Sequence, residues 1–275
     1  MTENNDKAYL QDLLLNIKAA YANQEVLSFK IIGPKEKGFQ VKVGGLFAYV
    51  SFNHFCWAYP SIDFWRPVSH SLIGMYFRGK VHSIGENPIS ILLDAKEQKF
   101  ETPNLENLTK YRGIALQKTK YGVFVDLGIH FNWKFGSILG LVHKTALIDE
   151  SILNHWKLGE EMNIQFLGYN EKGQIILGDN RERGKWLVGE MDHLIGTVQN
   201  VRVVISEAGK FRFYVAGIHK AILPITEELY PNHSAAAKKY ASSLSNGETI
   251  ECEVVKMNKR KSCLILKLLI EPPVA

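Results

Sequence analysis

The chain has 275 residues, of which 46% are hydrophobic and 22% are charged, and its net charge is +5. With this composition disorder is not the default for any long region, no low-complexity tract is present, and the length allows two or three modest domains or one large one. A mildly basic charge suits an anionic partner without demonstrating one. No run of about 18 apolar residues is present, and the polar, acidic first residues do not resemble a signal peptide, so no membrane association is expected.

The three cysteines have no CxxC spacing. They therefore predict neither a disulfide framework nor a zinc site. We expect a reduced, cytoplasmic setting, with no metal and no cofactor.

Residues 1–24 predict an amphipathic helix. Apolar side chains recur there at helical spacing: Leu10, Leu13, Leu14, Ile17 and Tyr21. We expect this stripe to pack on the following domain, with a separate partner as the alternative.

Three versions of one pattern follow the helix. Each has an apolar strand, an alternating strand, a glycine-rich break and a short third strand, and then a Gly-started β segment that turns and returns. The second and third strands are recognised in KGFQVKVGGLFAYV, in YGVFVDLG with GLVHKTAL, and in GKFRFYVAGIHKAILP. A segment that permits a helix lies before the fourth strand at 148–158 and at 227–244.

Five short strands with a helix before the fourth are typical of a small closed barrel of the OB type. The sequence therefore predicts a protein dominated by β structure, with three tandem five-stranded OB barrels after the short helix. We place these domains at 25–104, 107–183 and 190–272. Residues 181–185, between the second and third domains, are expected to form a hydrated linker.

The second strand of the middle domain carries an aromatic ring on its expected solvent face. If Val123 and Val125 point into the barrel, the alternation turns Phe124 toward solvent. Asp126 falls on the same face. Every nucleobase has an apolar face, and stacking one on an exposed ring contributes ~1–3 kcal/mol.

The middle domain resembles the S1 RNA-binding domain, the repeat of the ribosomal protein of that name. The matching positions are Gly113, YGVFVD at 121–126, GLVH at 140–143 and the Gly-Glu pair at 159–160. The outer two domains are weaker matches to the same pattern.

In the S1 family, exposed aromatic side chains and a histidine contact single-stranded RNA. The resemblance implies this role for Tyr121, Phe124 and His143. An Asp and an Arg near the last turn often complete the family's surface, and this sequence has Asn170 and Gln174 at those positions. Nearby lysines are expected to hold the phosphates: Lys118, Lys120, Lys134 and Lys144.

The third domain offers a second candidate patch. In FRFYV at 211–215, an inward Phe213 would turn Arg212 and Tyr214 outward, a pair that can stack on a nucleotide and neutralise it. Packing between domains is the alternative for Tyr121, Phe124 and His143, and it is the favoured interpretation for the aromatic-rich segment 52–65.

No nucleotide-phosphate, zinc-protease or nucleophile-elbow motif is present, and no set of carboxylates converges as a two-metal nuclease requires, so we expect no enzyme. The sequence predicts instead an RNA-binding protein of translation or RNA metabolism, with the ribosome or RNA-processing proteins as further partners. Two alternatives remain open: a protein–protein scaffold built on degenerate OB barrels, and a regulator that binds DNA as well as RNA.

Overall fold

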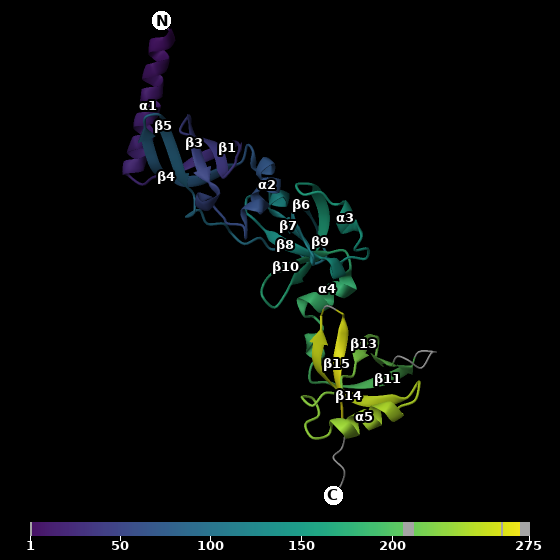
Figure 1. The fold of residues 1–275 in the computed structure, drawn as a ribbon. Coiled ribbons are helices and arrows are strands. Elements are labelled where there is room, and N and C mark those ends of the chain that lie inside the picture. Colours follow the sequence, from purple (N-terminus) through teal and green to yellow (C-terminus); the bar gives the residue numbers. More distant parts are fainter. Residues whose placement is uncertain (1, 206–211, 260, 270–275) are drawn as a thin grey trace. The chain divides into compact units, whose positions relative to one another are not determined.

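The computed structural model describes residues 2–205, 212–259 and 261–269, with side chains from residue 8 onward except those of residues 212 and 213. Three five-stranded sheets each close into a barrel, which confirms the predicted fold class (Figure 1). Among the described residues, none of the helices has the length and apolar character needed to span a bilayer.

The three barrels share one strand order. In the first, β1 pairs with β2 and β4, β2 with β3, and β3 with β5, and the β3–β5 pairing is parallel. Its strands are β1 Val26–Lys35, β2 Gly38–Val43, β3 Leu46–Ser51, β4 Tyr76–Glu86 and β5 Ile89–Asp94. A parallel closing pair in an otherwise antiparallel barrel is produced by the connection that crosses the barrel end before the fourth strand.

The middle and third barrels repeat this order. The middle barrel contains β6 Lys110–Thr119, β7 Gly122–Asp126, β8 Leu139–His143, β9 Glu161–Tyr169 and β10 Ile175–Gly178. The third contains β11 Val198–Ile205, β12 Arg212–Ala216, β13 His219–Ile222, β14 Thr249–Asn258 and β15 Cys263–Leu268.

The chain divides into two compact units. The first comprises 1–168 with 174–179 and contains the first and middle barrels, and the second comprises 169–173 with 180–275 and contains the third. Each unit is described by itself below.

The predicted N-terminal helix is α1, Thr2–Ala22, and its C-terminal half packs on the first barrel. Ile17 is buried and joins the barrel core, whereas Leu10 is exposed. Gly44 in the β2–β3 turn makes this approach possible, because a Cβ there would lie 2.8 Å from Ile17 Cδ1 and the backbone has a positive φ of 51°.

Helices occupy the predicted place before the fourth strand. They are α3 Ile152–His155 in the middle barrel and α5 Ser234–Ser243 in the third. The first barrel has a series of short helices there: η1 Phe52–His54, η2 Ile62–Phe64, α2 Trp65–Val68 and η3 Ser69–Leu72. The remaining single turns are η4 Gly128–Phe131, η5 Lys144–Ala146 and η6 Asp192–Leu194.

The expected linker at 181–185 is wrong, since this segment begins the helix α4, Arg181–Val188. The Asn180 side chain accepts a hydrogen bond from the Arg183 amide at 3.1 Å and so caps the helix. Trp186 is buried in the core of the third barrel and anchors the helix there. The charged residues at 181–185 suggested a solvated segment, and they gave no sign that Trp186, just after them, would bury its ring and hold the helix to the barrel.

The aromatic segment of the first barrel packs against the middle barrel. Trp133 of the middle barrel is buried, stacks on Trp57 with ring centroids 5.7 Å apart, and donates its indole N–H to the carbonyl oxygen of Ser71 at 3.2 Å. Phe55, Phe64 and Trp57 belong to the same apolar cluster. The predicted role of segment 52–65 in domain packing is confirmed.

Candidate nucleic-acid interface

Phe124 does not lie on an open face. Its ring is half-buried and packs against the first barrel's apolar cluster, 5.4 Å from the ring of Phe64. Every residue of β7 is buried or half-buried, so both faces of this strand are covered. The alternation correctly separated the two faces, but a strand read alone does not show that a distant segment covers the second one.

Asp126 was expected to face solvent and is instead fully buried. Its carboxylate accepts hydrogen bonds from the hydroxyls of Tyr59 and Ser137, both at 2.5 Å. It also accepts from the backbone amides of Gly128 at 2.8 Å and Ile138 at 2.9 Å. These bonds tie β7 to the connection before β8 and, through Tyr59, to the first barrel.

Burial is the largest influence on the pKa values of Asp126 and Tyr59. Desolvation raises the pKa of Asp126, and the hydrogen bonds it accepts oppose that shift. Burial, followed by the nearby Asp126 charge, raises the pKa of Tyr59 well above its ordinary value. A buried carboxylate with four donors joins two barrels and is not positioned to contact a ligand.

Tyr121 lies in the turn between β6 and β7, at the end of the middle barrel that we call its open end, and is 41% exposed. Its carbonyl oxygen accepts a hydrogen bond from the Lys144 amide at 2.9 Å, which holds the turn against the end of β8. The ammonium group of Lys120 lies 5.0 Å from the centre of the Tyr121 ring. An exposed ring beside a cation can stack on a base while the cation contacts a phosphate.

Gly122 permits this turn to approach β8. A Cβ at this position would lie 1.9 Å from the carbonyl oxygen of Val142, and the φ is 156°. Gly122 pairs directly with His143 in the β7–β8 register, so the glycine brings the Tyr121 turn next to the strand that carries the histidine.

His143 is half-buried at the end of β8. The Thr145 backbone amide donates to His143 Nδ1 at 3.2 Å, and the Thr145 hydroxyl lies 2.8 Å from the same nitrogen. Because Nδ1 accepts from a backbone amide, this network assigns the hydrogen of the neutral ring to Nε2. The ring therefore has the tautomer that can donate from Nε2 to a base edge or a phosphate.

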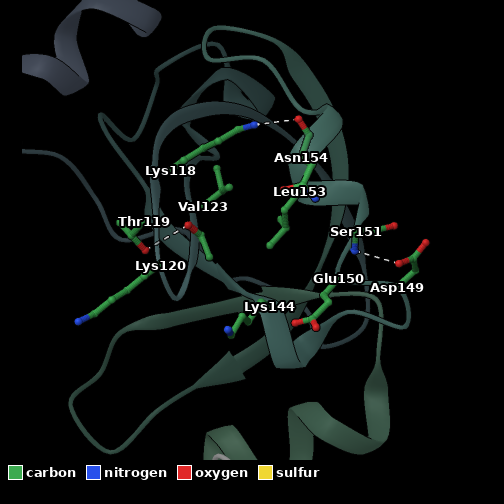
Figure 2. Close-up of a pocket in the computed structure, with 11 residues that line it drawn as sticks. Lys118, Thr119, Lys120, Val123, Lys144, Asp149, Glu150, Ser151, Leu153 and Asn154 are labelled. Atoms are coloured by element: carbon green, nitrogen blue, oxygen red, sulfur yellow. Dashed lines mark hydrogen bonds between the residues drawn. The ribbon is translucent and has the colours of Figure 1, made fainter.

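A pocket of about 460 Å³ opens beside this turn and is lined by three lysines (Figure 2). Lys118 reaches across it and donates to the Asn154 carbonyl oxygen at 3.2 Å, while Lys120 points away from the pocket centre. The full lining is Lys118, Thr119, Lys120, Gly122, Val123, Lys144, Asp149, Glu150, Ser151, Leu153 and Asn154. Two carboxylates oppose three ammonium groups, so the pocket lining has a small positive excess.

The predicted site residues Asn170 and Gln174 flank the turn between β9 and β10. Asn170 stabilises that turn: its side-chain oxygen accepts from the Lys172 amide and its carbonyl oxygen from the Gly173 amide, both at 2.9 Å. Gln174 is exposed just before β10.

Tyr214 was expected to point outward from the third barrel, and this is wrong. It is 8% exposed and pairs in register with Val203 and Ala221, which are both buried in the barrel core. The alternation of Phe211, Phe213 and Val215 favoured the wrong register, because the strand pairing places Tyr214 and Ala216 in the core instead. The Arg212 side chain lies outside the described residues.

No protein-family model matches the chain. It is 23% identical over 274 residues to small ribosomal subunit protein bS1 of Pseudomonas aeruginosa, an alignment that covers 93% of this chain and 45% of that protein. The chain thus spans less than half the length of this relative. A crystal structure of a multidomain protein with nucleic acid binding domains from Streptococcus pneumoniae shares 12% identity, covers 92% of this chain and 75% of that one, and gives a TM-score of 0.21.

Proposed function

We propose that the chain binds single-stranded RNA at the open end of the middle barrel. The observation that carries the proposal is an exposed Tyr121 beside a pocket lined by lysines, on the barrel whose motif resembles the S1 domain. Distant similarity to a small ribosomal subunit protein over most of the chain supports an RNA partner and a role in translation or RNA metabolism.

Each group in this interface has a separate role. Tyr121 stacks on one base, His143 donates from Nε2, and Lys118, Lys120 and Lys144 attract the phosphates. None of these contacts reads a base edge in a fixed pattern, so we expect little sequence preference. Phe124 and Tyr214 are absent from the proposed interface because their rings are used in packing.

The proposal is tested by titrating the full chain with a labelled single-stranded RNA and following fluorescence anisotropy. Tyr121→Ala should weaken binding by ~5- to 160-fold, the loss of one base–aromatic stack. The first barrel supplies a matched control, Tyr76→Ala: Tyr76 is 67% exposed and also lies below a lysine, with Lys30 Nζ 5.5 Å from its ring centre.

We expect Tyr76→Ala to bind like the unmodified chain. Equal affinities for the Tyr121→Ala variant and the unmodified chain would contradict the proposed site. A protein partner that stays bound after RNase treatment, together with no RNA affinity at all, would favour the scaffold alternative. The same titration with DNA of matching sequence tests whether the sugar is distinguished.

A further inference from the structure

Two histidines and an aspartate meet on the first barrel, in a place that the proposed RNA interface does not use. They are His54, His82 and Asp94, and their ligand atoms all lie within 4.8 Å of one another. Among the described residues, no other group of three or more His, Cys, Asp or Glu side chains brings its ligand atoms this close together. His54 and Asp94 are half-buried and His82 is exposed, so solvent ions can reach the cluster.

A β-bulge places His82 in this cluster. The β4–β5 register shifts between Val81 and Ser83, which leaves His82 as the extra residue of the bulged strand. Bulges of this kind redirect a side chain and are frequent beside functional sites.

The third barrel has the same bulge, with the register shift between Val254 and Lys256. Aligned on this register, Val255 occupies the place of His82, and Lys267 occupies the place of Asp94. The bulge therefore recurs in the third barrel, whereas the potential ligands at it in the first barrel do not. An ammonium at the position of Asp94 would repel a cation, so the two barrels form a natural contrast.

Neighbouring bonds orient two of the three side chains. His54 Nδ1 lies 2.9 Å from the Ser51 hydroxyl, and its Nε2 lies 3.9 Å from Asp94 Oδ2. In the tautomer that donates Nδ1–H to Ser51, Nε2 presents its lone pair to the cluster. Asp94 Oδ1 accepts from the Lys96 amide at 3.0 Å, which leaves Oδ2 as the atom nearest the histidine.

The lysine paired with Asp94 across the strands forms its ion pair with a different carboxylate. Lys80 is paired directly with Asp94 across the two strands, but its ammonium forms an ion pair with Glu97 at 2.7 Å. The two imidazole rings lie 4.9 Å apart and are tilted by 31°.

We propose that His54, His82 and Asp94 bind a divalent transition-metal ion of the zinc class. Imidazole nitrogens suit Zn²⁺, Co²⁺ and Ni²⁺, whereas Mg²⁺ and Ca²⁺ prefer oxygen ligands alone. Zinc holds nitrogen and oxygen ligands at about 2.0–2.2 Å, so the three side chains converge slightly when the ion binds. Three protein ligands leave a fourth position to water.

The experiment is a calorimetric titration of the full chain with ZnCl₂, without RNA, so its outcome is independent of the proposed function. We expect one ion per chain. His82→Ala and Asp94→Asn should each weaken binding at least tenfold, because each removes one of three ligands. Circular dichroism establishes that the variants remain folded. Because His82 is exposed, replacing it with Ala should disturb the fold little.

His70→Ala is the matched control, since His70 is an exposed histidine of the same compact unit outside the cluster. We expect it to retain the unmodified affinity. Absence of stoichiometric zinc binding would overturn the proposal. Binding that is equally tight in the His82→Ala and Asp94→Asn variants would overturn it as well, by placing the ion on other histidines.

Discussion

Two surfaces of the middle barrel carry aromatic side chains of the same short motif, and they have different surroundings. Phe124 packs on Phe64 of the first barrel, whereas Tyr121, three residues earlier, is 41% exposed beside a lysine-lined pocket. The difference shows that a single motif can place one ring in the packing between two barrels and leave another exposed. The position of the first barrel determines that Phe124 is covered and Tyr121 is not.

The largest effect is expected on stability, from removing the Phe64 ring that packs on Phe124. Phe64 is fully buried, so Phe64→Ala should lower the free energy of unfolding by about 3–5 kcal/mol. Chemical denaturation followed by tryptophan fluorescence measures this loss, because Trp57 and Trp133 report on the same cluster. Phe47→Ala is the control, since Phe47 is exposed and its removal should change stability by less than about 0.5 kcal/mol. Similar stabilities for both variants would show that the packed surface contributes little.

Replacing Tyr121 and Phe124 with the same residue, Leu, compares the roles of the two rings directly. Tyr121→Leu should cost ~1–3 kcal/mol of RNA-binding free energy, because a stacking platform is lost. Phe124→Leu retains an apolar side chain in the packed surface and should leave RNA affinity unchanged. Anisotropy titrations of the two folded variants make the comparison. The reverse ranking would assign the ligand to the surface that we describe as covered.

Charge at the open surface should be visible in the salt dependence of binding. Lys144→Ala should reduce the slope of log affinity against log salt by about 0.7, the value for one phosphate contact on a single strand. Adding Lys118→Ala should reduce it by about the same amount again. Lys30→Ala, on the first barrel, should leave the slope unchanged. Identical slopes for all three variants and the unmodified chain would exclude these lysines as phosphate contacts.

The smallest effect is expected from the titration of Asp126. Burial raises its pKa in the folded protein, so the folded chain keeps a proton that the unfolded chain has lost. This contribution to stability is complete below the ordinary pKa of about 3.8 and is lost as the pH rises through the folded value. Unfolding midpoints from pH 4 to pH 7 should therefore fall more for the unmodified chain than for Asp126→Asn. Parallel curves would mean that burial does not perturb this carboxyl group.

Much of the fold could be predicted, because the barrels depend on local information. Alternating apolar residues, glycine breaks and turn residues occur in the same order three times, and each set specifies a five-stranded barrel. The surroundings of individual side chains depend on segments distant in sequence. Asp126 was predicted to be exposed because nothing near it in the sequence reveals that Tyr59 reaches its carboxylate.

Some features of the candidate sites could likewise be predicted from local sequence, whereas others depend on how the strands pair. Tyr121 is accessible as predicted from its place in a turn, whereas Tyr214 is buried because its strand pairs in the register that places it between Val203 and Ala221. The cluster of His54, His82 and Asp94 could not be predicted, since it depends on a bulge at His82 and on strand pairing. Spacing along the chain carries no signal for ligands contributed by three separate elements.

The most direct test of the central claim is to map where RNA contacts the chain. Ultraviolet crosslinking of a single-stranded RNA to the full chain, followed by mass spectrometry of the peptides, locates the contacts without any substitution. We predict crosslinked nucleotides on residues 118–123 and 143–145. Efficient crosslinking confined to other parts of the chain, with these two segments unmodified, would contradict RNA binding at the open end of the middle barrel.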